Sequence, residues 1–216
     1  PYGADCPYLA EWGREPAARH SHVWTVPQNQ EGMALFYRRD IFAEAGLPDR
    51  VPETLDEMLA WARKITNPKE NLYGIAIPTT DTGWSTLSIL YSHEGRAVAQ
   101  DADGTWRCFF DSEQAVDAYT FVARMFLEPF ENDHGRFTSP VDTGDLASPG
   151  IRRGMWFAYL DQKSMEAIDA DVVGFGPVPK GPSGIRGSEY NCVMHGIYAG
   201  SGEDERVRDM AWEYMW

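Results

Sequence analysis

A continuous run of apolar residues opens the most regular part of the chain. Residues 32–37 (GMALFY) form a run of the length expected for a buried strand, and the polar residues 38–40 follow it. Residues 41–45 then predict a short helix, which Gly46 and Pro48 end because neither residue continues a helix. The hydrophobic pattern therefore predicts a strand that leads into a short helix and a turn.

A capped amphipathic helix is predicted after this turn. Thr54 and Glu57 have capping-box spacing, in which the side chain of each residue accepts a hydrogen bond from the backbone N–H of the other. Apolar residues then recur at helical spacing, at Leu55, Met58, Leu59, Ala62 and Ile65. One face of this helix is expected to be buried.

Short apolar runs bounded by proline or glycine predict further strands. They lie at residues 23–26, closed by Pro27, and at residues 73–78, 155–160, 172–176 and 193–199. The segments between several of them are rich in turn-forming residues, notably 79–84, 95–104 and 132–150. Such segments are expected to be loops, and the longest is expected to carry function or mobility.

Three further helices are predicted by periodicity and caps. The first covers residues 85–91. The second is capped at residues 111–114, with a predicted buried stripe of Val116, Tyr119, Val122 and Phe126. The third is capped at residues 201–204, and one face is shared by Val207, Met210, Ala211 and Tyr214. Strands and helices therefore alternate along the chain.

Composition and charge narrow the class of protein. The 216 residues are 43% hydrophobic and 13% aromatic, as expected for a folded chain and not for a disordered one. The formal net charge of −14 argues against a nucleic-acid partner, and it is also consistent with a charged surface that favours solubility. No apolar run approaches the roughly 18 residues of a membrane span.

Neither the cysteines nor the histidines predict a metal or cofactor site. Cys6, Cys108 and Cys192 allow at most one disulfide, and their separations match no zinc-ligand spacing. His20 and His22 are close enough in sequence to share a metal ion, but no third ligand accompanies them. We therefore expect no cofactor and no metal.

The segment from the first strand to the capped helix resembles one family in particular, the extracellular solute-binding proteins of bacterial ABC importers. Within that family it resembles the maltose-binding-like, family 1 sugar-binding type. The matching features occur in the family's order and spacing: Phe36-Tyr37, Arg39-Asp40, Phe42, Gly46-Leu47-Pro48 and Pro52-x-Thr54-x-Asp56-Glu57. The resemblance continues at Tyr73-Gly74 and in later segments, and it extends from about Val23 to the end of the chain.

The resemblance implies an α/β fold of the periplasmic-binding-protein kind, mainly its second lobe with crossover strands to the other lobe. Residues 1–30 would be a remnant of the first lobe and the entry to the hinge, and residues 31–180 the second lobe. Residues 181–216 would be a crossover strand and a helix that return toward the first lobe. Family members normally carry a first lobe before this region, so the chain is expected to be a fragment or a shortened member.

The resemblance also implies a function. Such proteins capture an extracellular sugar or another small polar solute reversibly and deliver it to the membrane permease of an ABC importer. The implied location is periplasmic or extracellular, with lipid anchoring an option for the full-length protein. The implied state is a monomer that binds no nucleic acid.

A sugar site needs aromatic faces that stack on the solute and planar polar groups that bind its hydroxyls. The family carries such groups on loops at the cleft between the lobes. The resemblance implies six ligand-binding residues in these loops: Glu31, Asp81, Trp84, Asp161, Tyr190 and Asn191. None of them is expected to be catalytic or to bind a metal.

Ordinary structural explanations stay open for several of these residues. Glu31 is equally consistent with a solvated acid at the hinge, and Trp84 with a buried core side chain. Tyr190 and Asn191 are equally consistent with a turn before the returning strand. The polar surroundings of Trp84, on the loop that also carries Asp81, favour the site.

The residues around Asp161 bear on the type of solute. The family often has a stacking tryptophan a few residues after this position, where this chain has Gln162-Lys163-Ser164. This difference disfavours a maltodextrin. Met155-Trp156 and Asp161 partly match the pattern of polyol- and monosaccharide-binding relatives instead.

Two other classes of function are alternatives to solute binding. A secreted carbohydrate-active enzyme would use a pair of Asp or Glu side chains that flank the scissile bond. With 33 acidic residues chance pairs are unavoidable, and no Gly-x-Ser-x-Gly, P-loop, Gly-x-Gly-x-x-Gly or His-Glu-x-x-His motif occurs. The other class is an interaction module without a small ligand. The sequence therefore predicts binding and not catalysis.

Overall fold

The structure is a computed structural model that describes residues 26–77, 82–127, 152–159, 170–197 and 204–215. The chain divides into two compact units, Gly32–Glu189 and Pro1–Glu31 with Tyr190–Trp216. The boundaries of the lobes expected from the sequence, after residues 30 and 180, stay a prediction.

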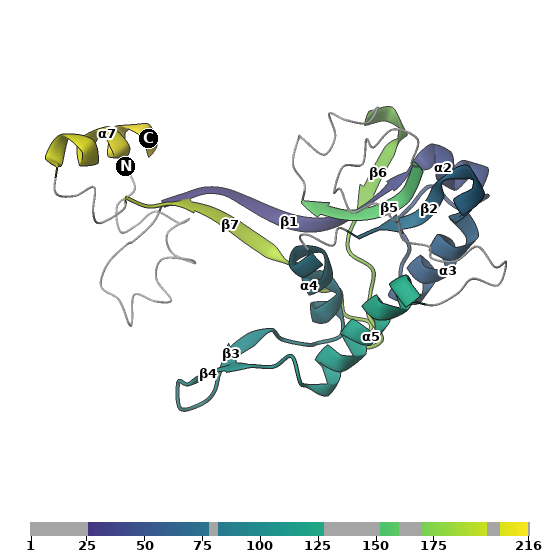
Figure 1. Ribbon diagram of the computed structural model, residues 1–216, viewed down its shortest axis with the longest axis horizontal. Helices are drawn as coiled ribbons and strands as arrows, with labels where there is room; N and C mark the ends of the chain where they lie inside the picture. The colour runs from purple at the N-terminus through teal and green to yellow at the C-terminus, as the bar shows by residue number, and fades with distance from the viewer. Residues whose placement is uncertain (1–25, 78–81, 128–151, 160–169, 198–203, 216) are drawn as a thin grey trace. The chain divides into compact units, whose positions relative to one another are not determined.

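One mixed sheet forms the centre of the unit Gly32–Glu189. Its strands lie in the order β2 (Leu72–Ala76), β5 (Arg152–Tyr159), β1 (Val26–Arg38) and β6 (Val173–Gly176), as Figure 1 shows. β1 runs antiparallel to both β5 and β6, whereas β2 and β5 are parallel. β1 therefore lies inside the sheet with a partner on each side. It also pairs with β7 (Tyr190–His195).

The apolar part of β1 is buried on both faces of the sheet. Met33, Leu35 and Tyr37 pack into the larger hydrophobic core, and Ala34 and Phe36 pack into a smaller core on the other face. Successive side chains of a strand point to opposite faces, so a strand covered on both sides needs an unbroken apolar run. The predicted buried strand is confirmed for this reason.

The predicted strand end at Pro27 is wrong. β1 begins at Val26 and continues through Pro27 to Arg38. A proline removes one ladder hydrogen bond, which a strand tolerates near its first residue, and Pro27 is the second residue of β1. The remaining residues of that predicted strand, 23–25, lie outside the described part of the chain.

Both helices predicted after β1 are present. α2 (Arg39–Glu44) is followed by Gly46, whose φ of +62° is the left-handed conformation that favours glycine after a helix. α3 (Leu55–Ile65) lies beside β2 in Figure 1, and the single turn η2 (Pro68–Glu70) joins the two. α3 buries its whole predicted face, with Trp61 in addition: Leu55, Met58, Leu59, Ala62 and Ile65.

The cap of α3 differs from the predicted reciprocal pair. Thr54 Oγ1 accepts a hydrogen bond from the Glu57 N–H at 3.1 Å, as predicted. The Glu57 carboxylate instead accepts from the N–H of Glu53 at 2.5 Å and forms an ion pair with Arg50 at 2.8 Å. The bond from Arg50 lowers the pKa of the Glu57 carboxyl group. This ion pair holds the carboxylate away from the Thr54 N–H, so only half of the predicted box forms.

α4 (Thr82–Ser92) begins three residues earlier than the predicted helix. Trp84 therefore lies in the first turn of a helix and not in a loop, which corrects the sequence-based assignment. The N–H groups of a first helical turn need no intrahelical partner, so Thr82 and Gly83 fit there although they resemble loop residues.

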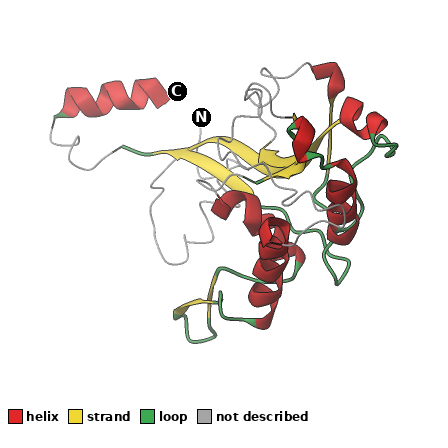
Figure 2. Ribbon diagram, turned by 45° about the vertical axis from the view of Figure 1, so that its right-hand side comes forward, coloured by secondary structure: helices red, strands yellow, loops and turns green. Residues whose placement is uncertain are grey.

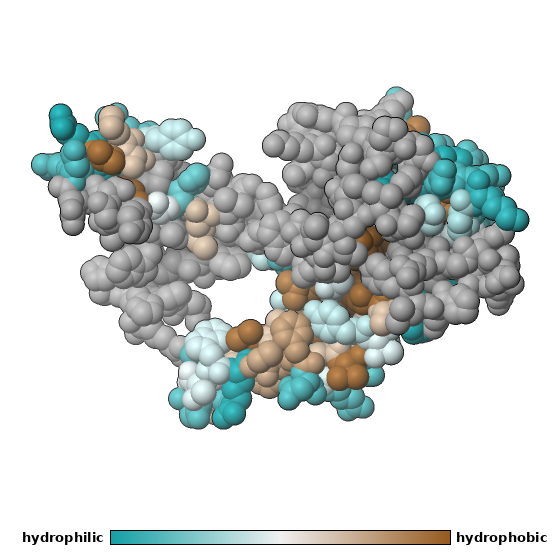
Figure 3. All heavy atoms as spheres, viewed as in Figure 1, coloured by the Kyte–Doolittle hydropathy of each residue, from teal (hydrophilic) through white to brown (hydrophobic). Residues whose placement is uncertain are grey.

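A short hairpin occupies part of the predicted turn-rich link. β3 (Val98–Gln100) pairs antiparallel with β4 (Trp106–Cys108), apart from the main sheet (Figure 1, Figure 2). Figure 3 shows apolar side chains at the surface in this region, where Val98, Trp106 and Phe110 are exposed. Strands of three residues are too short for an alternating pattern, which explains why the sequence did not predict them.

The predicted helix α5 (Glu113–Leu127) is present, but its buried face is different. Ser112 caps it, because the Ala115 N–H donates to Ser112 Oγ at 3.3 Å. Val122 is buried as predicted, whereas Val116 is exposed. Among the side chains of α5 that the structure describes, Tyr119 is half-buried and the buried set is Ala115, Ala118, Phe121, Val122 and Met125, whereas the side chain of Phe126 lies outside the described ones. α5 packs on α4, and alanines at the contact allow the two helices a closer approach than larger side chains would.

The elements near the C-terminus are shifted from their predicted bounds. β6 begins at Val173, after the single turn η3 (Ala170–Val172). β7 begins three residues before the predicted strand at 193–199, and Met194 is half exposed where a buried strand was expected. Tyr190 and Asn191, expected in a turn or loop before this strand, are its first two residues.

α7 (Glu205–Met215) follows Asp204, whose carboxylate accepts a hydrogen bond from the Arg206 N–H at 3.0 Å. Three side chains of its predicted common face are exposed, at Val207, Met210 and Tyr214. None of the helices in the described stretches has the length and hydropathy that a bilayer crossing requires.

Replacing Gly74 with Ala is expected to destabilise the unit Gly32–Glu189 by about 3 kcal/mol, at the upper end for overpacking. A Cβ at Gly74 would collide with the backbone of Ala62, so the close packing of β2 on α3 depends on glycine there. Urea unfolding measures the loss. Gly32→Ala is the control, since a Cβ at Gly32 meets nothing within 4 Å, and its expected change is about 0.5 kcal/mol or less. Equal effects of the two substitutions would contradict the prediction.

Candidate functional site

Two parallel strands end at the same edge of the sheet. β2 and β5 are parallel, with Ala76 opposite Trp156, so their carboxyl ends lie together. Ligands of open α/β sheets bind outside the carboxyl ends of the strands. The chain leaves β2 toward Asp81 and Trp84, and it leaves β5 two residues before Asp161. The structure thus brings together the strand ends that lead to these three predicted residues.

The backbone around Met33 belongs to the same end of the sheet. Met33 lies opposite Tyr159, the last residue of β5, and its N–H donates to the Glu189 C=O at 3.0 Å. Glu31 precedes Met33 by two residues, and Tyr190 and Asn191 follow Glu189 directly. Within this unit, the backbone of Met33, the last residue of β5 and the backbone of Glu189 therefore lie at one end of the sheet.

The side chains themselves are placed for one predicted residue. Tyr190 is the first residue of β7, and its side chain is 48% exposed. Glu31, Trp84 and Asn191 lie on β1, α4 and β7, and the structure describes their backbone but not their side chains. Asp81 and Asp161 lie outside the described residues. The composition of the site stays a prediction.

Two buried serines of α4 hold the segment that leads to β7. Ser92 Oγ accepts a hydrogen bond from the Gly187 N–H at 2.8 Å and donates to the Pro179 C=O at 3.3 Å. Ser88 Oγ accepts from the Glu189 N–H at 3.2 Å. These hydroxyls fix the backbone just before Tyr190. Neither serine is among the residues predicted from the sequence, although two serines four residues apart in an apolar helix are a detectable signal.

Tyr91, also on α4, is neutral at ordinary pH. Burial raises the pKa of its phenol, and the negative charge of Glu189 raises it further. A neutral hydroxyl can both donate and accept a hydrogen bond. α4 therefore contributes uncharged polar groups next to the backbone of Glu189.

Glu53 connects the start of α3 to the same segment. Its carboxylate binds Lys180 Nζ at 2.5 Å and Arg186 Nη2 at 2.8 Å. The bonds from Lys180 and then from Arg186 lower the pKa of the Glu53 carboxyl group. The backbones meet as well, since the Leu55 N–H donates to the Lys180 C=O at 2.9 Å. Residues 180–189 are thus attached to α3 at one end and to α4 at the other.

The part of the chain that the structure describes contains no candidate metal site. No three His, Cys, Asp or Glu side chains there come close enough together to hold an ion. The arrangement consists of the ends of β2 and β5 and of uncharged polar side chains of α4, Ser88, Tyr91 and Ser92.

This architecture is that of a periplasmic binding protein, which confirms the predicted fold class. An ABC transporter solute-binding protein from Thermotoga lettingae, solved with bound α-D-tagatose, matches it with a TM-score of 0.69 at 22% identity. The match covers 89% of this chain and 49% of that one. At the level of sequence, residues 3–215 match the family described as bacterial extracellular solute-binding protein. The chain belongs to this family.

Two proteins with similar sequences are named for the solutes that they bind. The erythritol/L-threitol-binding protein of Mycolicibacterium smegmatis is 28% identical over an alignment of 170 residues, and the match covers 74% of this chain and 35% of the relative. The mannitol-binding protein of Pseudomonas aeruginosa is 24% identical over an alignment of 166 residues, and the match covers 73% of this chain and 37% of the relative. The chain spans little more than a third of the length of these two relatives.

Glu53→Gln is expected to reduce the loss of stability in acid. A carboxyl group whose pKa is lowered by folding stabilises the protein above its ordinary pKa, here 4.5, and this contribution disappears as the pH falls through the folded value. Urea midpoints at about pH 7 and about pH 4 measure the difference. The exposed Glu94 forms no ion pair within the described residues, so Glu94→Gln should keep the acid sensitivity of the unchanged protein. The same sensitivity in both variants would contradict the role of Glu53.

Proposed function

We propose that this chain is the solute-capturing component of an ABC importer and binds a small sugar or a polyol reversibly. The observation that carries the proposal is the family match over residues 3–215. The ends of β2 and β5, from which the chain leads to Asp81, Trp84 and Asp161, lie together at one edge of the sheet, and this arrangement supports it. Captured solute passes to the membrane permease of the importer, and the protein works as a monomer in the periplasm or outside the cell.

The solute class follows from two lines of support. Both named relatives bind sugar alcohols, of four carbons in one case and six in the other. The residues after Asp161 lack the stacking tryptophan that a maltodextrin binder often has. A linear polyol or a monosaccharide therefore fits better than an oligosaccharide.

Each predicted residue has a role in this proposal. Trp84 and Tyr190 present aromatic faces to the carbon chain of the solute. Glu31, Asp81 and Asp161 accept hydrogen bonds from its hydroxyls, and Asn191 both donates and accepts. No covalent step is involved, so we propose binding without catalysis.

Titration calorimetry of this chain with erythritol, mannitol, ribitol and tagatose tests the proposal. Saturable heats with any of them support it. The titration extends to high millimolar solute, because a chain that spans little more than a third of the length of its relatives is expected to offer only part of their contacts. Absence of binding to every solute would contradict it. Turnover of a glycan by the same sample would favour the carbohydrate-active enzyme instead.

Trp84→Ala is expected to weaken binding of the preferred solute by about tenfold. Loss of one aromatic contact costs on the order of 1.4 kcal/mol, which is a factor of ten in affinity. Trp106→Ala is the matched control, since Trp106 lies exposed on β4 in the separate hairpin. An unchanged affinity of Trp84→Ala would remove Trp84 from the site.

A further inference from the structure

α4 carries one proposed binding residue and, on the next two turns, two buried hydroxyl groups. Trp84 is the third residue of the helix, and Ser88 and Ser92 follow at intervals of four. Both serines are fully buried. Residues four apart in a helix lie on one side of it. The backbone of Trp84 is therefore one helical turn from Ser88 and on the same side.

The two serines hold one segment of chain in a defined register. Ser92 Oγ accepts a hydrogen bond from the Gly187 N–H at 2.8 Å, and Ser88 Oγ accepts from the Glu189 N–H at 3.2 Å. Four residues of α-helix rise about 6 Å, and two residues of chain span at most about 7 Å, so the acceptors and the donors match in spacing. A shift of α4 by one residue along its axis would separate both pairs.

The same segment approaches the backbone of α4 closely. A Cβ at Gly187 would collide with the backbone of Tyr91 and Ser92, and a Cβ at Gly181 would collide with the Ser92 C=O. Glycine permits such a close approach because it has no side chain. The segment therefore has little freedom to take another position on α4.

Hydrogen bonds also connect this segment to the sheet. The Glu189 C=O accepts from the Met33 N–H at 3.0 Å, and Ser188 Oγ donates to the Met33 C=O at 2.9 Å. Met33 lies opposite Tyr159, the last residue of β5, and β5 ends beside β2. A continuous path of hydrogen bonds thus runs from Ser88 on α4 to the edge of the sheet where β2 and β5 end.

The apolar contacts of α4 hold the helix in a different way. Ile89 and Leu90 are fully buried in the larger core, and α4 packs on α5. Hydrophobic attraction has no preferred direction, so it fixes a helix along its own axis less sharply than directed hydrogen bonds do. The position of α4 along its axis therefore depends on the two serine hydroxyls.

We propose that Ser88 is a positioning residue for solute binding. Its hydrogen bond to the backbone of Glu189 sets the position of Trp84 relative to the ends of β2 and β5. Ser88 does not touch the solute and acts through Trp84. The inference rests on the proposed function, to which the role of Trp84 belongs.

The test is a double-mutant cycle, measured by titration calorimetry with erythritol, mannitol, ribitol and tagatose. Ser88→Ala is expected to weaken binding of the preferred solute about threefold, because the ring of Trp84 is present but less precisely placed. The double variant is expected to bind as weakly as Trp84→Ala alone, about tenfold below the unchanged protein, since Ser88 then has no ring to position. Independent contributions would instead multiply to about thirtyfold.

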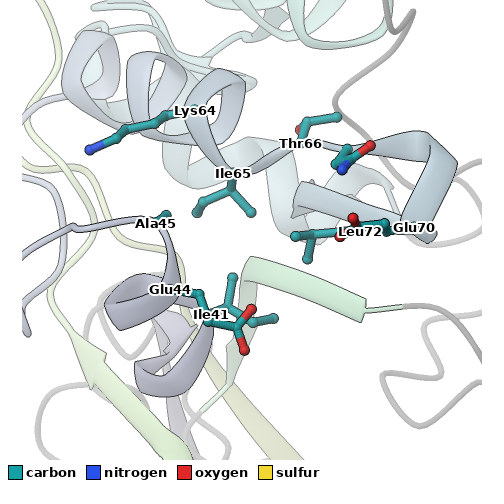
Figure 4. Close-up of a pocket in the computed structure, with 9 residues that line it drawn as sticks. Ile41, Glu44, Ala45, Lys64, Ile65, Thr66, Glu70 and Leu72 are labelled. Carbon is teal, nitrogen blue, oxygen red and sulfur yellow. The ribbon is translucent and has the colours of Figure 1, made fainter.

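Thr66→Val is the matched control. The Thr66 hydroxyl is also buried and accepts a hydrogen bond from a backbone N–H, that of Gly74, at 2.9 Å. Thr66 follows α3 and, with Ile65 and Leu72, lines a separate pocket that Figure 4 shows. Its replacement leaves a buried N–H without an acceptor, as Ser88→Ala does, so a similar decrease in melting temperature is expected. Solute affinity is expected to stay unchanged.

Amide hydrogen exchange in the absence of solute gives a second readout. The Glu189 N–H is expected to exchange about tenfold faster in Ser88→Ala, which removes its acceptor, and not in Thr66→Val. An unchanged rate in Ser88→Ala would overturn the inference, because the hydrogen bond would then not hold the segment.

The affinities separate this inference from the proposed function. Unchanged affinity of Ser88→Ala, additive losses in the double variant, or an equal loss of affinity in Thr66→Val would each overturn the inference. The proposed function would stand in these cases, because the unchanged protein still binds its solute. Absence of binding by the unchanged protein to every solute would contradict the proposed function, and the inference with it.

Discussion

The structure depends on covering both faces of one strand. β1 has neighbours on both sides in the sheet and an unbroken run of five buried residues, 33–37, and its neighbour β5 shares both properties. α3 packs on the face that carries Leu35, and the stacked rings of Phe36 and Trp156 occupy the other face. Because both faces of β1 are apolar and must stay covered from solvent, the helices and strands around β1 are fixed in position. The edge of the sheet where the strands end is rigid for the same reason.

The segment of residues 180–189 is held at several points within the unit Gly32–Glu189. Glu53 holds it through Lys180 and Arg186, and the serines of α4 hold it at Gly187 and Glu189. The last of these contacts lies beside Met33, to which Ser188 also donates, at 2.9 Å. Three elements that are distant in sequence thus fix one stretch of backbone. Binding residues on neighbouring loops gain precision from such a support.

The sequence predicted elements well where a local rule and the core agreed. The apolar run of β1 and the buried face of α3 are examples. A strand buried on both faces requires a continuous apolar run, and a helix buried on one face requires apolar residues at helical spacing. It failed where two patterns competed, as in α5, which has apolar residues on more than one face and buries the alanine-rich one. The position of Trp84 was wrong because the first turn of a helix resembles a loop in composition.

The pairing of β1 also sets the order in which the chain can fold. Met33 pairs with Tyr159, and Phe36 with Phe175, so the partners of the central strand are made long after the strand itself. Contacts so distant in sequence require large loops to close, which slows folding. Until β5 and β6 have been synthesised, the five apolar residues of β1 have no sheet neighbours. Their exposed surface then favours aggregation with other chains. The strand that organises the native structure is therefore the part of the nascent chain most in need of protection from aggregation.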